Sequence, residues 1–137
     1  MAQSEIKNIV QAYFDAFNQS DIDALLALLH EDVVHDINEG ERQIGKQAFR
    51  LFYAQAMRSF DETRSDLAIM VSQSSGRAAA EFTRRGSYVS SVEGLPAANG
   101  QTYSLQGGVF FEMDDGLITR VTGYFNKAEL MRQLTGD

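Results

Sequence analysis

The spacing of apolar residues changes near Thr63, and this change limits the fold more than any other feature of the chain. Before it, apolar side chains recur about every three to four residues, which is typical of amphipathic helices. After it, they alternate with polar side chains, which is typical of strands with one buried face. A chain of 137 residues is the size of one domain, so we expect helices and strands to share one core.

Three helices are expected in the first half. Ser4 is the expected N-cap of the first. A short second helix is expected from Asp21 to about Leu29, after a capping box in residues 20–23. The third follows Gly45. Apolar stripes define the first and third: Ile6, Ile9, Val10, Tyr13, Phe14 and Phe17, then Ala48, Phe49, Phe52, Tyr53, Ala56, Met57 and Phe60.

A short strand is expected at residues 33–37, and four longer strands follow residue 63, with turns at 74–76 and 114–116 and a loop at 93–100. A few helical residues, 127–134, close the chain. Strands joined by hairpins form an antiparallel sheet, and helices on one face of it give an α+β fold. A strongly twisted sheet makes a cone with a cavity between the layers. No repeat or linker divides residues 1–137, so we expect one domain.

Composition excludes several function classes. The formal charge of -7 argues against nucleic acid or an anionic membrane as partner, since both require a basic face. The chain has no cysteine, hence no disulfide, thiolate nucleophile or cysteine metal site. It has no apolar run long enough to span a bilayer and no signal-peptide pattern, so we expect a cytoplasmic protein.

Four stretches resemble a known family: Ala12-Tyr13-Phe14, Ser20 to Ala24, His35-Asp36-Ile37 with Ile44-Gly45, and Asp114 to Ile118 running on to Tyr124-Phe125. Together they make residues 6–134 similar to the nuclear-transport-factor-2-like (NTF2-like, cystatin-like) superfamily, in particular its ketosteroid-isomerase-related and SnoaL-like polyketide cyclase group. The resemblance implies a curved sheet packed on three helices. It also implies a homodimer formed through the outer sheet face, where Phe110 and Tyr124 are the candidate contacts.

The resemblance also implies candidate catalytic residues. The general base of ketosteroid isomerases falls on Asp36, and their tyrosine hydrogen-bond donor falls on Tyr13. Their protonated aspartate falls on Val109, which cannot donate, so half of that oxyanion site is missing. The implied chemistry is cofactor-independent proton abstraction from a small hydrophobic carbonyl compound, by an isomerase or a cyclase.

Each candidate has a structural alternative. At the mouth of an apolar cavity the pKa of Asp36 would be raised, which suits a base, but Asp36 also fits a capping residue of the turn at 38–40. Tyr13 lies on an apolar stripe and also fits a core ring whose hydroxyl needs a polar partner. Arg84 lies on the apolar face of its strand. Its guanidinium group is expected to pair with Asp36 or to bind a substrate carboxylate or enolate. In the alternative, the guanidinium group is exposed to solvent at the rim of the sheet or at a dimer interface.

Metal and cofactor chemistry has little support in the sequence. His30 and His35 are one residue too far apart for two zinc ligands on one helical turn, and side chains adjacent on a strand, such as those of His35 and Asp36, point to opposite faces. There is no phosphate-binding glycine loop and no serine nucleophile elbow. The epoxide hydrolase arrangement of this fold lacks a second inward aspartate. We expect no metal and no cofactor.

Large apolar side chains are expected either to line a ligand cavity or to fill a dry core. Three functions follow: an enzyme of the implied type, a non-catalytic binder of a small hydrophobic molecule in the same cavity, or a dimeric interaction module. The candidate lining residues are Phe17, Phe52, Tyr53, Met57, Phe82, Tyr88, Val109, Phe111 and Phe125.

Overall fold

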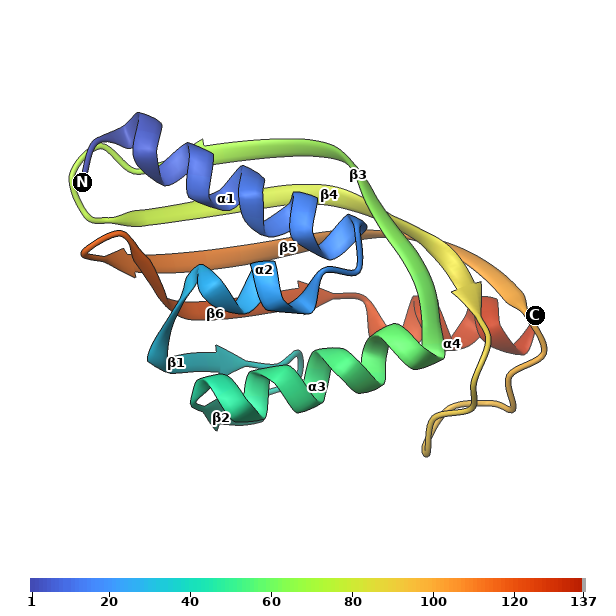
Figure 1. The fold of residues 1–137 in the computed structure, drawn as a ribbon. Helices are drawn as coiled ribbons and strands as arrows, with labels where there is room; N and C mark the ends of the chain where they lie inside the picture. The colour runs from blue at the N-terminus through green and yellow to red at the C-terminus, as the bar shows by residue number, and fades with distance from the viewer. Residues whose placement is uncertain (137) are drawn as a thin grey trace.

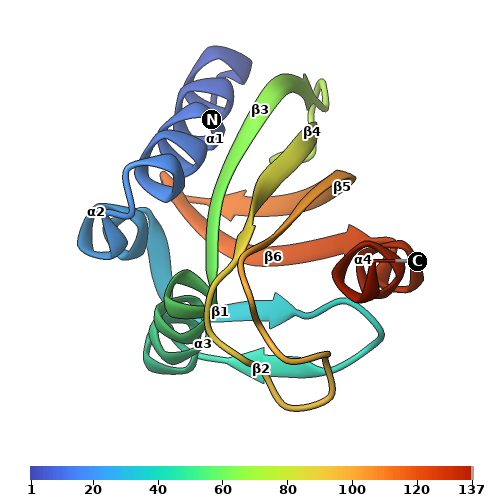
Figure 2. The same cartoon turned by 90° about the vertical axis from the view of Figure 1, so that its right-hand side faces the viewer.

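A computed structural model describes residues 1–136 and shows one curved sheet of six strands in the order β2-β1-β6-β5-β4-β3 (Figure 1). Helices α1, α2 and α3 lie on its concave side, and α4 packs near one end (Figure 2). This is the expected α+β architecture. The elements, in chain order, are α1 (Gln3–Asn18), α2 (Ile22–Ala27), β1 (Leu29–Asp36), β2 (Arg42–Ile44), α3 (Lys46–Ser59), β3 (Phe60–Val71), β4 (Arg77–Tyr88), β5 (Gln101–Asp114), β6 (Leu117–Phe125) and α4 (Lys127–Thr135).

The helix starts differ from the predicted ones in detail. The N-cap of α1 is Ala2, without a side-chain hydrogen bond, so the prediction of Ser4 is wrong. Asp21 caps α2, because its carboxylate accepts a hydrogen bond of 3.0 Å from the backbone nitrogen of Ala24. The second helix is also shorter than expected and ends at Ala27, where the chain turns into β1.

The sheet is mixed rather than purely antiparallel, which corrects the expectation. β1 pairs in parallel with β6, with His35 opposite Val121 and Asp36 opposite Thr122. β1 also begins earlier than predicted, and the three-residue β2 beside it was not predicted. Two parallel strands must be joined by a long crossover connection. Here the part of the chain from β2 to β5 forms that connection between β1 and β6. The strand that comes last in the chain therefore lies inside the sheet.

β3 bends, and the bend closes the sheet around the helices. β3 begins at Phe60, directly after α3, although the helical stripe was expected to include that residue. Its pairing with β4 shifts between Ser65 and Ala68, and Asp66 has a left-handed φ of 55°. An extra residue in one strand increases twist and curvature. As a result, β3 and β4 wrap over the concave face.

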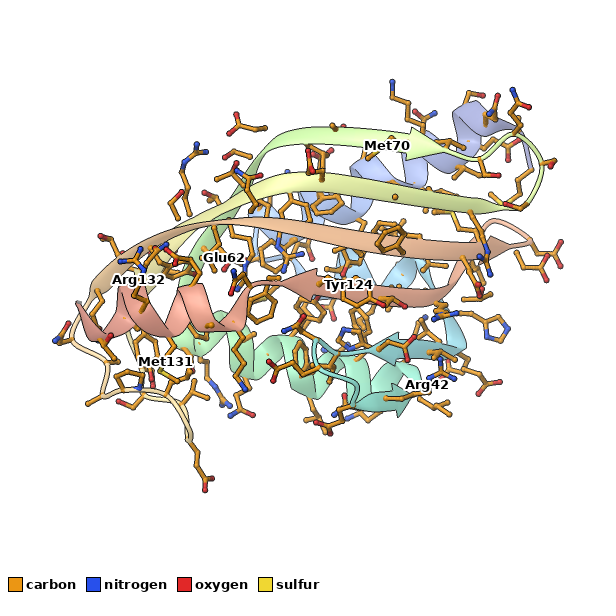
Figure 3. The ribbon with its side chains drawn as sticks, turned by 180° about the vertical axis from the view of Figure 1, so that it is seen from behind. Arg42, Glu62, Met70, Tyr124, Met131 and Arg132 are labelled. Atoms are coloured by element: carbon orange, nitrogen blue, oxygen red, sulfur yellow. The ribbon has the colours of Figure 1, made fainter. Side chains whose placement is uncertain are left out.

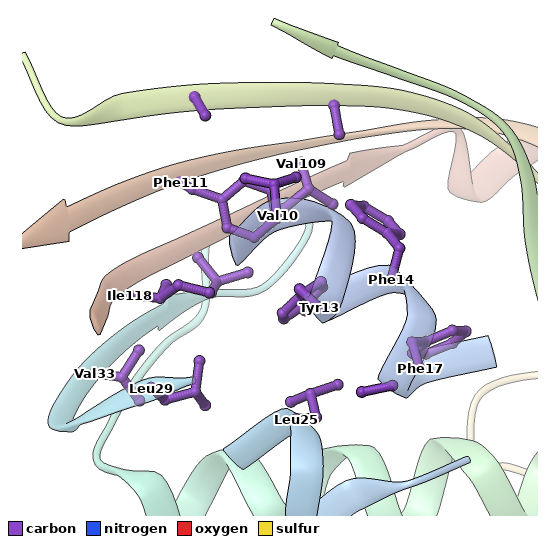
Figure 4. Packing of buried hydrophobic residues seen from close by; sticks show 14 of the residues in the cluster. Val10, Tyr13, Phe14, Phe17, Leu25, Leu29, Val33, Val109, Phe111 and Ile118 are labelled. Atoms are coloured by element: carbon purple, nitrogen blue, oxygen red, sulfur yellow. The ribbon is translucent and has the colours of Figure 1, made fainter. Parts of the chain in front are cut away.

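Two clusters of buried side chains divide the interior. The larger packs α1, α2 and α3 on the sheet and includes Val10, Phe14, Leu25 and Phe111 (Figure 4). The smaller packs α4 against the ends of β4 and β5, with Tyr88, Tyr103, Leu105, Leu130 and Leu134. Each buried aliphatic or aromatic side chain contributes about 1.5–3 kcal/mol of hydrophobic stabilisation.

The outer face of the sheet carries exposed aromatic side chains. Phe110 and Tyr124 are 54% and 57% exposed, with ring centroids 5.9 Å apart, and Tyr124 is visible on this face in Figure 3. The homodimer through this face stays a prediction. Within residues 1–136, no helix is both long and apolar enough to cross a membrane.

Candidate functional site

A cavity of about 400 Å³ opens between the concave face of the sheet and the helices. This volume is within the usual range for small-molecule sites. Most of its wall is apolar and comes from α1, α3 and β4 to β6. Polar side chains enter from the sheet: His35 from β1, Glu62 and Arg64 from β3, and Arg84 from β4.

Glu62 joins two arginines inside this cavity. Its Oε1 accepts hydrogen bonds from Nε and Nη2 of Arg84, at 3.0 and 2.8 Å, and its Oε2 accepts one from Nε of Arg64 at 3.2 Å. Tyr103 donates its hydroxyl to Oε1 at 2.7 Å. Arg64 and Arg84 are direct cross-strand partners, where like charges repel. The shared carboxylate offsets this repulsion. We call Glu62, Arg64 and Arg84 the Arg-Glu-Arg cluster.

The cluster is charged despite its burial. Burial raises the pKa of the Glu62 carboxyl, but the charges of Arg84 and Arg64 and the hydrogen bonds outweigh it, so the pKa lies below its usual value. Burial and the neighbouring Glu62 carboxylate raise the pKa of Tyr103, which keeps its hydroxyl protonated as a donor. Two cations and one anion therefore stand together in the cavity wall.

Aromatic rings hold the two guanidinium groups. The Arg64 guanidinium carbon lies 3.9 Å from the centroid of Phe17 and 5.0 Å from that of Phe82. The Arg84 guanidinium carbon lies 4.6 Å from the centroid of Phe125. Cations over ring faces are attracted by the ring quadrupole, more strongly when water is excluded. The rings fix the two arginines in place while leaving part of each guanidinium unbonded.

His35, rather than Asp36, directs its side chain into the cavity. Its ring packs among Phe49, Phe52 and Tyr53, with centroids 4.7 to 5.8 Å away. Burial lowers the pKa of His35 to about 4, and the charge of Arg64 adds to this effect, so the imidazole is neutral near pH 7. Its Nδ1 is buried without a hydrogen-bond partner among residues 1–136.

Asp36 also borders the cavity, but its carboxylate points to the opposite face of β1, as expected for adjacent positions on a strand. Its carboxylate lies with Thr122 on the outer face, where it accepts hydrogen bonds from Arg42, from Arg120 at 2.9 Å and from Thr122 at 2.9 Å. The bond from Arg42 is the main cause that lowers the pKa of Asp36 to about 2. The expected rise in this pKa is therefore wrong. Nor does this carboxylate accept a hydrogen bond from the described residues of the turn at 38–40, since it instead joins β1 to β2 and β6.

Tyr13 lies behind the cavity wall. It is fully buried in the larger cluster, with its ring edge-on to Phe14 and Phe111, and its hydroxyl is 3.0 Å from that of Tyr53. This is the polar partner that a buried tyrosine was expected to need. Burial and the neighbouring Tyr53 raise the pKa of Tyr13 well above its usual value. Tyr53 itself lines the cavity.

Most of the predicted lining residues meet at the cavity. Tyr88 and Phe111 instead pack in the core beside it, Tyr88 against Phe60 with centroids 5.2 Å apart. Arg84 lines the cavity, as its predicted role in substrate binding requires. It pairs with Glu62 and not with Asp36. The predicted residues in the lining are Phe17, Phe52, Tyr53, Met57, Phe82, Val109 and Phe125.

The sequence interpretation missed Glu62, Arg64, Tyr103 and the inward direction of His35. A signal was available: Glu62 and Arg64 continue the alternation of Leu67 and Ile69 towards the start of β3, apart from the shift at the bulge. Charged residues at inward positions are informative because an unpaired buried charge is costly. Residues 1–136 hold no group of three or more histidine, cysteine, aspartate or glutamate side chains arranged to bind a metal ion.

Comparison with known proteins agrees with the fold. A candidate polyketide cyclase from Xanthomonas campestris pv. campestris is 45% identical, with a TM-score of 0.94 over 98% of this chain and 99% of that one. Another from Pseudomonas putida KT2440 is 49% identical, with a TM-score of 0.90 over 92% and 95% of the two chains.

A candidate ketosteroid isomerase from Kribbella flavida DSM 17836 shares the fold at 22% identity, with a TM-score of 0.70 over 90% of this chain and 79% of that one. None of the curated proteins matches the chain. The sequence model of the SnoaL-like domain family matches residues 10–121. The protein therefore belongs to the SnoaL-like family of the NTF2-like superfamily.

Proposed function

We propose that the protein is a cofactor-independent enzyme that moves a proton on a small hydrophobic carbonyl compound held in the cavity. The observation that carries this proposal is a neutral imidazole and buried guanidinium groups in the wall of one largely apolar cavity. Such a site combines a proton acceptor with positive charge for the oxygen that becomes negative. The family membership and the similarity to candidate polyketide cyclases support the same class of substrate.

In this proposal His35 is the general base. It takes a proton from the carbon next to the carbonyl group and becomes an imidazolium, while the electrons of the broken C–H bond form the enolate. The imidazolium then returns the proton to the same carbon or to another carbon conjugated with it. A base whose pKa is about 4 suffices only where the enolate is strongly stabilised.

Arg64 and Tyr53 supply that stabilisation. The Arg64 side chain is only 10% exposed, so its charge acts through a medium that screens it weakly. Tyr53 lines the cavity, and its hydroxyl lies 3.0 Å from that of Tyr13 behind it. Tyr13 thus acts through Tyr53 as a positioning residue. Asp36, with its carboxylate held by Arg42 and Arg120, has no part in the proton transfer.

Deuterium exchange tests the proposal without knowledge of the natural substrate. The purified protein is incubated in deuterated buffer with a panel of cyclic and aromatic ketones, and incorporation beside the carbonyl is followed by NMR or mass spectrometry. We expect catalysed exchange with at least one ketone. Exchange should fall about a hundredfold or more in His35→Gln, the loss typical of a removed general base.

Asp36→Asn is the matched control, because it changes the neighbouring residue on the opposite face of β1. Exchange that survives in Asp36→Asn but not in His35→Gln supports His35 as the base. The reverse result would return the role to Asp36. A protein that binds the ketones but exchanges no deuterium in any form is the non-catalytic binder of the same cavity.

A further inference from the structure

The buried charged side chains of the cavity wall carry one more positive charge than negative charge. The other charged residues of the lining, Asp61, Glu93 and Lys127, are exposed to solvent. Arg64 and Arg84 are 10% and 13% exposed, and Glu62, at 4%, is the carboxylate that both share. His35 is neutral near pH 7, and the carboxylate of Asp36 belongs to the outer face. A buried charge without a partner costs free energy, so the cavity favours a molecule that brings one negative charge.

Donors for such a charge are available on both arginines. Arg84 uses Nε and Nη2 on Glu62, and no described residue accepts a hydrogen bond from its Nη1. Arg64 donates from Nε to Glu62, and its Nη1 is buried without a partner among residues 1–136. Arg64 and Arg84 stand directly opposite each other on β3 and β4, and both residues line the cavity.

We propose that the ligand of this cavity is a hydrophobic monocarboxylate, with its carboxylate bound by Arg84 of the Arg-Glu-Arg cluster, which leaves Arg64 to the enolate oxygen. The inference rests on the proposed function only in using the same cavity, and it names the class of substrate: a hydrophobic acid with a carbonyl group elsewhere in the molecule. The apolar body of the ligand lies against Phe52, Met57 and Val109, which line the rest of the cavity.

The chemistry of the wall favours a carboxylate over a phosphate. One surplus positive charge balances a monoanion in the bound ground state, whereas a phosphate dianion would place a second, permanent charge beside Glu62 before any reaction. Guanidinium groups match the planar carboxylate with paired N–H donors. The hydroxyl of Tyr103, which could otherwise serve an anion, is already donated to Glu62.

The test compares three probes of one shape: 2-naphthoate, its neutral amide 2-naphthamide, and the cation 2-naphthylmethylammonium. None of them can form an enolate by loss of a C–H proton next to a carbonyl, so binding is measured apart from catalysis. Titration calorimetry or NMR on the full chain gives the three affinities. We expect 2-naphthoate to bind at least about tenfold more tightly than the amide, and the cation to bind most weakly.

Arg84→Gln locates the site, and Arg85→Gln is its control. Arg85 is the next residue on β4, but it is 53% exposed and pairs with Asp66 on the surface. The preference for 2-naphthoate over 2-naphthamide should disappear in Arg84→Gln and persist in Arg85→Gln. Circular dichroism of each variant shows whether it is folded. The probe comparison on the unmodified protein decides the question even if Arg84→Gln does not fold.

Equal binding of the acid and the amide would overturn the proposal, as would a preference lost equally in both variants. The outcome is separable from that of the proposed function. If the protein prefers the carboxylate probe but catalyses no deuterium exchange on any ketone or keto acid, this inference stands and the proposed enzymatic function is overturned. Exchange on neutral ketones without carboxylate preference keeps the enzyme and overturns this inference.

Discussion

Replacing His35 with phenylalanine should remove a pH dependence of folding that the unmodified protein shows. The folded structure lowers the pKa of His35 from 6.5 to about 4, chiefly by burial. Below about pH 6.5 the unfolded chain therefore binds a proton that the folded chain rejects. The stability contributed by the neutral imidazole is complete above that pH, is lost as the pH falls towards 4, and falls no further below it.

The size of the effect follows from the two pKa values. At about pH 5 the difference in proton binding lowers the free energy of unfolding by about 2 kcal/mol relative to about pH 7.5. Urea unfolding followed by far-ultraviolet circular dichroism at these two pH values measures it. His35→Phe should reduce this loss to a few tenths of a kcal/mol, and His30→Gln, at an exposed histidine, should leave it unchanged. Equal losses in the unmodified protein and His35→Phe would refute the burial argument.

Three further predictions concern stability. Asp36→Asn should lower the free energy of unfolding by about 1–2 kcal/mol near pH 7 and by little near pH 2. The carboxylate, whose pKa falls to about 2, stabilises the fold only while it is ionised. Denaturant titrations at both pH values check this. Gly86→Ala should lower the melting temperature by several degrees, because the added Cβ would stand 2.4 Å from a backbone oxygen of β3. Gly123→Ala is the control and should change the melting temperature little, because no described atom lies within 4 Å of its added Cβ. Tyr103→Phe should cost about 1.5–3 kcal/mol in urea unfolding, because Glu62 loses the shortest of its hydrogen bonds; an unchanged midpoint would contradict the proposed charge on Glu62.

The fold could be predicted largely from periodicity, because that signal is local. The helical stripes and the alternating strands depend on residues a few positions apart, and the α+β arrangement follows from their order. β2 was missed because three residues carry too little pattern. The parallel pairing of β1 with β6 was missed because partners about 90 positions apart leave no local trace.

The site was harder to predict because it depends on which face each side chain takes. Shifting the register of a strand by one residue exchanges its two faces. On β1 this decides between His35 and Asp36, and the resemblance to ketosteroid isomerases favoured Asp36. Arg84 was recognised because it interrupts an apolar face. Its partner Glu62 was not, because the start of β3 was set three residues or more too late.

The place of β6 in the sheet has a consequence for synthesis of the chain. β6 lies between β1 and β5, so β1 and β2 have no path into the rest of the sheet until residues Leu117–Phe125 have left the ribosome. Until then, the inner edges of β1 and β5 are unpaired, and such edges pair readily with those of other chains. A nascent chain stalled before β6 is therefore expected to be a substrate for chaperones, whereas one stalled after it can close the sheet.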